Sequence, residues 1–157
     1  MKKLLLLLFV TSLFQVNAQI KKVDDSNKPI EVGKAGDALS TQATMYKIKG
    51  EPDYYYVTFN NAKFQTLTDI KSFGFKDIDG AFDYLFNSVV KASKEKKKEV
   101  EFELEDGILT IQLTRAMGVI NTQINWYENG VLSYSGYITA KKFSKLFAKP
   151  YVKKDWK

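Results

Sequence analysis

Cysteine and histidine are both absent from this chain of 157 residues, and each absence excludes a class of chemistry. Without cysteine no disulfide can form, so the fold must depend on packing alone. Without histidine, Ser-His-Asp and Cys-His nucleophile systems are excluded, and so are zinc sites built on His or Cys. Carboxylate, lysine and tyrosine chemistry remains available. We predict no metal site and no cofactor.

Arginine is almost absent as well, because Arg115 is the single arginine among 24 basic residues. Proteins that bind nucleic acid commonly use arginine for bidentate contacts with phosphate and guanine. This scarcity, together with the export signal described next, argues against nucleic acid as a partner. We expect Arg115 to form a structural salt bridge with Glu99 or another acid across a sheet, and a ligand contact is the alternative.

The longest apolar run lies at the start of the chain. Two lysines precede the apolar residues 4–10, and Val16 and Ala18 occupy the positions that a signal peptidase reads. The run is shorter than the roughly 20 apolar residues of a membrane span. We predict a cleavable signal peptide over residues 1–18, cut before Gln19, and a periplasmic or secreted product.

Removal of this signal also changes the charge of the chain. The formal net charge falls from +6 to +4, because the signal carries two lysines and no acid. A lipid anchor on a cysteine is impossible, since no cysteine follows. We find no later stretch apolar and long enough to span a bilayer, so we predict no transmembrane span in the mature form.

The rest of the chain divides by composition. Residues 19–45 are polar, contain no aromatic residue and are interrupted by proline and glycine, which predicts a flexible lead-in with at most a short strand near residues 30–32. Aromatic residues begin at Tyr46, and we predict a single domain over residues 46–150. The basic residues 151–157 are predicted to form a tail that is loose apart from its aromatic residues.

The clearest predicted element is a helix over residues 77–98. Its apolar face consists of residues three or four positions apart: Ile78, Phe82, Leu85, Phe86 and Val89. Asp77 or Asp79 can cap the first turn. Before this helix, β-forming residues predict strands over 54–59 and about 63–70. After it, Thr139 is predicted to cap a short helix over residues 140–148.

Two hairpins are predicted between the helices. Asp106-Gly107 is typical of a two-residue turn and would place Leu104 opposite Leu109 on a buried face. For the second hairpin, a three-residue loop ending at Gly130 would place Trp126 beside Leu132, apolar against apolar. A two-residue turn would instead place Trp126 beside Ser133. We favour the three-residue loop.

These elements predict an α+β fold in the order ββ-α-ββββ-α. We expect an antiparallel sheet of about five to six strands, with one long and one short helix packed on one face. Part of this order, a strand followed by a helix, four strands and a second helix, resembles the order of elements in the half-repeat of the TATA-box-binding protein. No motif accompanies the resemblance, so it implies nothing about function.

A stripe of glutamates follows one face of the predicted first hairpin. Its members are Glu99, Glu101, Glu103 and Glu105, and alternate positions on a strand lie about 7 Å apart. Such a stripe is typical of a solvated strand near a sheet edge, where charge discourages aggregation. It is also suited to a basic partner surface or a weakly held divalent cation.

Tyrosines form the second group of candidates. Three adjacent tyrosines at 54–56 cannot all be buried in a one-sided sheet, so we select Tyr55 as a binding residue. Tyr127 and Tyr137 fall on the polar face of the second hairpin. Exposed tyrosine rings suit a protein partner or sugar rings, although scattered surface tyrosines often have no role.

The function expected from these features is an exported, non-catalytic binding module. The binding residues are predicted to be Tyr55, Tyr127, Tyr137, Glu101, Glu103 and Arg115. A protein partner is the leading expectation, including an inhibitor, an immunity-like protein or an envelope accessory protein. The alternatives are a module that binds a polysaccharide through its tyrosines and a small hydrolase or lyase that uses Glu and Tyr.

Overall fold

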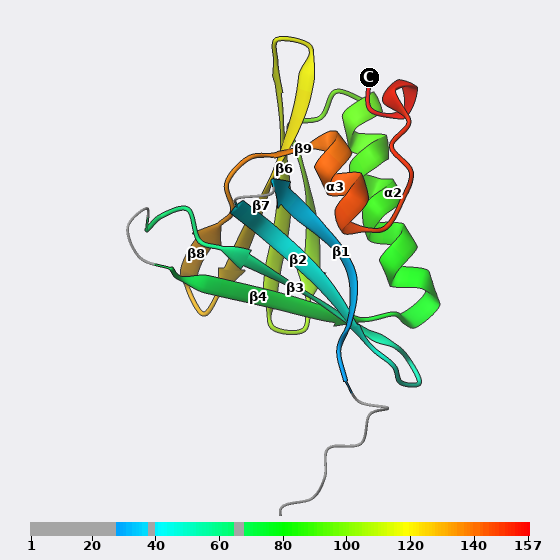
Figure 1. Ribbon diagram of the computed structural model, residues 1–157, viewed down its shortest axis with the longest axis vertical. Helices are drawn as coiled ribbons and strands as arrows, with labels where there is room; N and C mark the ends of the chain where they lie inside the picture. Colours follow the sequence, from blue (N-terminus) through cyan, green and yellow to red (C-terminus); the bar gives the residue numbers. More distant parts are fainter. Residues whose placement is uncertain (1–27, 38–39, 65–67) are drawn as a thin grey trace, which may run out of the picture.

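The computed structural model describes residues 28–37, 40–64 and 68–157, which form two antiparallel sheets and two α-helices (Figure 1). The predicted α+β class and the antiparallel strand pairing are confirmed. The strands form a four-stranded and a five-stranded sheet instead of a single one, and four strands precede the first helix. The predicted signal peptide lies outside the described residues.

The first sheet is a meander in the order β1-β2-β3-β4. Its strands are β1 (Ile30–Asp37), β2 (Ser40–Ile48), β3 (Tyr54–Asn60) and β4 (Ile70–Lys76). The predicted strand over residues 54–59 corresponds to β3 and is confirmed. The predicted strand over 63–70 is wrong, because β4 begins at Ile70 and residues 63 and 64 lie in the connection before it.

The predicted flexible lead-in is wrong for residues 30–37 and 40–45, which lie in β1 and β2. Their buried side chains include the small Ala35 and Ala43, both at most 1% exposed. At Gly33 the strand lies so close to the end of a helix that a Cβ atom would be 2.7 Å from the carbonyl oxygen of Leu146. Small residues permit this packing, and their lack of bulk made the segment resemble a linker.

The first helix begins with a single 3₁₀ turn, η3 (Ile78–Gly80), and continues as α2 (Ala81–Lys94). The Asp77 carboxylate accepts a hydrogen bond from the backbone N–H of Phe82 at 2.9 Å, which confirms the predicted capping role. Leu85, Phe86 and Val89 are buried as predicted, whereas Ile78 is 58% exposed. The helix ends before the predicted residue 98.

The second sheet contains β5 (Glu99–Leu104), β6 (Gly107–Ala116), β7 (Val119–Glu128) and β8 (Val131–Tyr134), in that order. The two-residue β9 (Ile138–Thr139) also pairs with β7.

In the first hairpin Leu104 lies opposite Gly107, two residues from the predicted register. An even shift leaves every side chain on its predicted face. A Cβ atom at residue 107 would be 2.9 Å from the Trp126 ring, so this glycine serves packing within the strand.

The second hairpin has the register that we did not favour. Trp126 lies opposite Ser133, and the turn consists of Asn129 and Gly130, with φ angles of 50° and 79°. Positive φ at both positions is characteristic of a type I′ turn. Trp126 packs toward the first sheet, with its ring 5.6 Å from that of Phe73, while Leu132 remains 49% exposed. The predicted three-residue loop, with Leu132 paired with Trp126, is therefore wrong.

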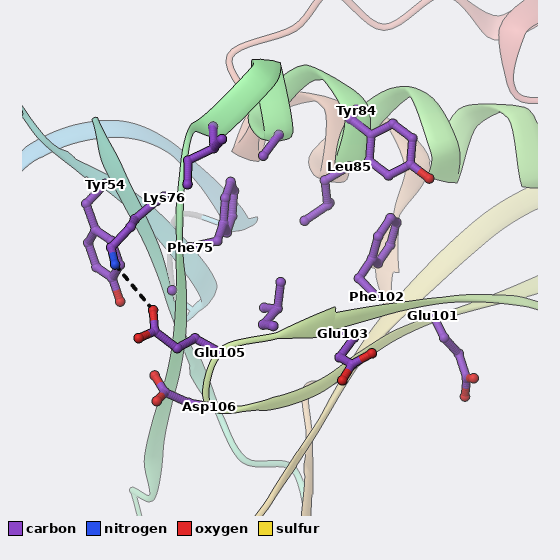
Figure 2. Close-up of a pocket in the computed structure, with 14 residues that line it drawn as sticks. Tyr54, Phe75, Lys76, Tyr84, Leu85, Glu101, Phe102, Glu103, Glu105 and Asp106 are labelled. Carbon is purple, nitrogen blue, oxygen red and sulfur yellow. Dashed lines mark hydrogen bonds and ion pairs between the residues drawn. The ribbon is translucent and has the colours of Figure 1, made fainter. Parts of the chain in front are cut away.

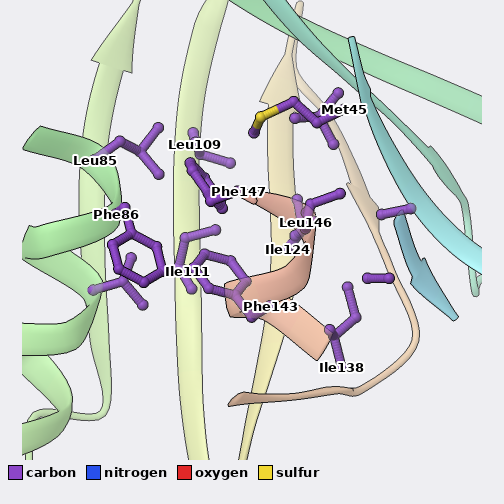
Figure 3. Packing of buried hydrophobic residues seen from close by; sticks show 14 of the residues in the cluster. Met45, Leu85, Phe86, Leu109, Ile111, Ile124, Ile138, Phe143, Leu146 and Phe147 are labelled. Carbon is purple, nitrogen blue, oxygen red and sulfur yellow. The ribbon is translucent and has the colours of Figure 1, made fainter. Parts of the chain in front are cut away.

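The core lies on one face of the second sheet. Leu109, Ile111 and Ile124 of that sheet pack against α2, against α3 (Ala140–Leu146) and against Met45 of the first sheet (Figure 3). Both helices therefore lie on the same face, as predicted. The opposite face of the second sheet carries the glutamates of β5 and Tyr127.

The C-terminal segment is attached to this core. It contains a 3₁₀ turn, η4 (Lys153–Asp155), followed by Trp156, which is 1% exposed. The ring of Trp156 packs edge-on against Phe86, and the backbone carbonyl of Trp156 accepts a 2.9 Å hydrogen bond from the Ser93 hydroxyl. The prediction of a loose tail excepted its aromatic residues, and Trp156 is the aromatic residue that attaches the tail, because its buried ring contributes a large apolar surface.

Candidate functional site

A cavity of 520 Å³ lies between the end of β4, the first turns of α2 and the β5–β6 hairpin (Figure 2). Its lining is Tyr54, Gly74, Phe75, Lys76, Ile78, Ala81, Tyr84, Leu85, Glu101, Phe102, Glu103, Leu104, Glu105 and Asp106. This lining combines an apolar interior with acidic side chains at the mouth.

The alternating sequence of β5 produces both parts of this lining. Phe102 and Leu104 are half-buried on the face that looks toward α2, while Glu101 and Glu103 are exposed on the other face. Strand β5 pairs with β6 along one of its edges. Among the described residues, no strand pairs with its other edge, so β5 is an edge strand of the sheet. The cavity therefore borders a strand edge whose backbone groups have no sheet partner.

Aromatic and aliphatic side chains form the interior of the cavity. Phe75 and Leu85 are 8% and 4% exposed and point into the space between the helix and the hairpin (Figure 2). Tyr84 stands at the rim with 67% of its surface exposed, and its ring lies edge-on to Phe102 at 6.3 Å. An apolar ligand side chain would find several ring faces here.

The mouth of the cavity carries a negative charge. Four acidic residues line it, and Lys76 is the basic residue among the described lining. The Lys76 ammonium lies 3.5 Å from the Glu105 carboxylate, and the two side chains are 54% and 79% exposed. A pair this exposed contributes little stability, and it leaves Asp106 as the unpaired carboxylate at the mouth. The carboxylates of Glu101 and Glu103 lie beside the cavity on the outer face of β5, where they can attract a cationic ligand (Figure 2).

Tyr54 closes one side of the cavity by lying over Gly74. A Cβ atom at residue 74 would be 3.0 Å from the Tyr54 ring carbon Cε1, so a side chain there would displace the ring. Burial raises the pKa of the Tyr54 hydroxyl, the carboxylates of Asp106 and Glu105 raise it further, and Lys76 opposes them. The hydroxyl therefore stays protonated at neutral pH and can donate a hydrogen bond.

The predicted binding residue Tyr55 is part of the core. It is 8% exposed, and its ring stacks against Phe82 at 4.5 Å and Phe75 at 5.8 Å between centroids. Tyr55 alternates with Tyr54 and Tyr56 along β3, so it faces the opposite side of the first sheet. Sequence reasoning placed the wrong one of these three tyrosines at the surface.

Tyr127 and Tyr137 are exposed, at 47% and 58%. Tyr127 lies on the outer face of the second sheet, directly opposite Ile108 of β6 and Leu132 of β8. On β5, Glu103 lies opposite Ile108. One row of side chains across the outer face of the sheet is therefore acidic at β5 and apolar at β6 and β8. The two tyrosines are separate from the cavity that Glu101 and Glu103 line.

Arg115 lies near the opposite end of β6. Its guanidinium Nη2 donates a hydrogen bond to the backbone carbonyl of Ser93 at the end of α2. The predicted partner was Glu99 or another acid, and the structure supplies a carbonyl group instead. Helix carbonyls in the last turn lack partners within the helix, which explains this contact.

Sequence reasoning missed the aromatic residues of the cavity. Tyr84 falls outside the apolar face that Leu85 and Phe86 share, and an aromatic residue on the solvent side of an amphipathic helix was a usable signal. Lys76 and Tyr54 carried no such signal, because their positions at the mouth result from how the first sheet lies against the β5–β6 hairpin.

Comparisons with known proteins add no functional information. A scan of family models finds no match to the chain, and searches of curated proteins and of solved structures find none either. Within residues 28–37, 40–64 and 68–157, no helix has the length and apolarity to cross a bilayer. In the same residues, no three acidic side chains are grouped closely enough to hold a metal ion.

Proposed function

We propose that this protein is a non-catalytic binding module whose cavity beside β5 holds an extended, basic and amphipathic segment of a partner protein. The observation that carries the proposal is the combination of an apolar interior, an acidic mouth and an unpaired strand edge at one place. Each of these features alone is common on protein surfaces, and together they specify the chemistry of a ligand.

The free edge of β5 supports an extended conformation for this segment. A peptide that adds to a sheet edge gains backbone hydrogen bonds, and its side chains alternate between the two faces of the sheet. On one face they would meet Phe102 and the cavity, and on the other they would meet Glu101 and Glu103. An alternation of apolar and basic residues matches both faces.

Charge favours a basic segment over an acidic one. Glu101 and Glu103 occupy alternate positions of β5, which places them about 7 Å apart, the same spacing as alternate side chains of an added strand. Opposite charges in neighbouring strands stabilise the pairing, whereas like charges oppose it. Lysine or arginine at every second position of the partner is therefore the complementary pattern.

The exposure of the same glutamates favours binding over catalysis. A catalytic carboxyl group is normally enclosed with the reacting groups in a site that excludes water. Glu101 and Glu103 are both exposed on one strand face. Tyr127 and Arg115, which a Glu- and Tyr-dependent hydrolase or lyase would use with them, lie away from the cavity.

One observation supports a second candidate, the binding of a polysaccharide. The exposed ring of Tyr127 lies between Ile108 and Leu132, where a sugar ring could stack, and Asn125 on the same face of β7 could hydrogen-bond to sugar hydroxyls. Retention on insoluble polysaccharide that Tyr127→Ala abolishes would favour this candidate. Retention that survives the substitution would remove it.

The test of the leading proposal uses a fluorescent peptide of about six alternating lysine and valine residues, which matches the length of β5. We expect it to bind the wild-type protein, and we expect a peptide of alternating glutamate and valine not to bind. Glu101→Lys combined with Glu103→Lys should weaken binding by about tenfold or more, because like charges then face each other. Tyr84→Ala should weaken it several-fold by removing part of the apolar rim.

A matched control keeps the net charge change constant. Glu31→Lys combined with Glu51→Lys reverses two exposed acids outside the cavity. This control should bind the peptide as the wild type does. Equal loss in the control, or equal binding of the acidic peptide, would overturn the proposal, because binding would then follow overall charge or simple hydrophobicity.

A further inference from the structure

The turn between β6 and β7 presents an apolar surface to solvent. Residues 116–119 form this tip, where Met117 is 104% exposed and Val119 is 46% exposed. Figure 1 shows the hairpin extending beyond the rest of the molecule, with the C-terminus near the same end. Apolar residues at a projecting turn expose surface that the fold of this chain does not use.

Local backbone geometry does not explain a methionine at this turn. Met117 and Gly118 have φ angles of 50° and 75°, nearly the angles of Asn129 and Gly130 in the other hairpin. Asparagine suits the left-handed region because its short side chain bonds to the local backbone, and methionine lacks this capacity. The tip therefore carries an apolar residue where a polar one would fold more easily.

Basic residues surround the base of this hairpin. The end of α2 and the C-terminal segment meet there, because the Ser93 hydroxyl bonds to the Trp156 carbonyl at 2.9 Å and the Ser93 carbonyl accepts from Arg115. The Lys98 carbonyl accepts from the N–H of Leu113 at 2.6 Å, which holds the lysine-rich turn against β6. The basic residues of these segments are Lys91, Lys94, Lys96, Lys97, Lys98, Arg115, Lys153, Lys154 and Lys157.

Few acidic groups offset this charge. Within the same segments the acids are Glu95, Glu99 and Asp155. Asp155 pairs with Lys94 at 3.0 Å, and Glu95 lies 2.9 Å from Lys97. The end of the molecule that carries the apolar tip therefore has a strong positive surplus, in contrast to the acidic cavity at the other end of the sheet.

From this arrangement we propose that the β6–β7 end docks on an anionic lipid surface. Met117 and Val119 insert among the lipid headgroups, and the surrounding lysines contact the lipid phosphates. An apolar tip flanked by lysines is the combination that binds interfaces of this kind. The inference goes beyond the proposed function, because it concerns a different surface and a different class of partner.

The type of basic residue favours lipid over an acidic protein. Lysine is a point charge on a flexible stem, whereas arginine forms fixed bidentate contacts with carboxylates at defined positions. Headgroup charges move with the lipids, so flexible single charges are suited to them. The projecting form of the tip also suits a soft interface that can admit two side chains.

The test measures co-flotation of the protein with lipid vesicles. Vesicles of equal parts phosphatidylglycerol and phosphatidylcholine should retain the wild-type protein, and vesicles of phosphatidylcholine alone should not. Met117→Asn combined with Val119→Thr should reduce retention by about tenfold, since insertion of apolar groups is lost. The new Asn-Gly turn preserves the hairpin, so loss of folding does not complicate the result. Val131→Thr combined with Leu132→Thr removes exposed apolar groups from the other hairpin and should have no effect.

A second pair of variants tests the charge. Lys98→Gln combined with Lys154→Gln should weaken binding by about fivefold for each lysine removed. Lys49→Gln combined with Lys63→Gln, which alters lysines outside this end, should leave binding unchanged. Equal binding to uncharged vesicles, equal loss in both lysine pairs, or binding to a poly-glutamate peptide but not to vesicles would each overturn the proposal. The last result would indicate an acidic protein partner.

Discussion

The two ends of the second sheet differ in shape and in the sign of their charge. At the β5–β6 turn, Glu105 and Asp106 border a cavity with an apolar interior, and Glu101 and Glu103 lie on the outer face of the adjoining strand. At the β6–β7 turn, lysines surround an apolar tip that projects into solvent. Strand β6 belongs to both ends, so opposite surfaces are separated by the length of one strand.

This difference shows that the net charge of the chain conceals its surface organisation. A net charge of +6 suggests a mildly basic protein. Charges beyond a Debye length of about 8 Å are screened from each other at physiological salt. A ligand at either end therefore responds to the local charge, and the two ends are suited to ligands of opposite sign.

The largest predicted effect is a difference in the free energy of unfolding between two glycine variants, one at each end of the second sheet. Gly107→Ala should lower the free energy of unfolding by about 3 kcal/mol, because its Cβ would overlap the Trp126 ring and the backbone of β7. Gly118→Ala should cost about 1 kcal/mol, since a Cβ there meets no described atom within 4 Å and its φ of 75° is the remaining penalty. Urea unfolding of both variants measures the difference. Equal losses would show that packing on Trp126 does not define the cavity end.

The next effect is the independence of the two ends in binding. Glu101→Lys with Glu103→Lys should reduce binding of the lysine–valine peptide by about tenfold and leave vesicle retention intact. Met117→Asn with Val119→Thr should do the reverse. Measuring both ligands on both variants tests the comparison directly. If either variant lost both ligands, the two ends would not be separate sites.

A smaller effect concerns the stability of the apolar tip. Met117→Asn should raise the free energy of unfolding by about 0.5–1 kcal/mol, because asparagine is better suited to the left-handed position of this turn. The reciprocal change Asn129→Met in the other hairpin should lower it by a similar amount. Thermal unfolding reports both changes. A methionine that stabilises either turn would contradict the view that Met117 is retained for a contact outside the fold.

The smallest effect is a pH dependence at the cavity end. The pKa of Tyr54 is raised in the folded protein by burial and by Asp106 and Glu105. The folded state therefore holds this proton more tightly than the unfolded state, so stability is complete below the unfolded value of about 10 and decreases as pH rises through the folded value. The wild type should lose stability over this range faster than Tyr54→Phe. Parallel pH profiles of the two proteins would contradict the assignment.

Elements with a strong local pattern were predicted well. The spacing of Leu85, Phe86 and Val89 specified the helix, and Asp77 and Thr139 cap their helices as predicted. The alternation of β5 indicated its buried and exposed faces. These features depend on residues within one helical turn or on neighbouring positions of a strand, so the local sequence contains the information.

Other features depend on distant contacts, and there the predictions were wrong. The first two strands, predicted as a flexible lead-in, pack through small residues against α3. In the second hairpin the small residue Ser133 lies opposite Trp126 on the inner face, where Trp126 packs on Phe73 of the first sheet. Pairing apolar residues across the hairpin led to the wrong register, because that argument considered one hairpin without its neighbours.

The candidate site divides in the same way. Glu101 and Glu103 were identified from the sequence, since alternating glutamates on a strand are visible without a structure. Only the tertiary structure showed that Tyr55 lies in the core and that Tyr84 and Tyr54 border a cavity beside those glutamates. The sequence by itself determined the α+β class, the face of each side chain on β5 and the absence of thiol and imidazole chemistry. Which faces meet, and therefore where a cavity forms and where an apolar tip stays exposed, was decided by packing between segments far apart in the chain.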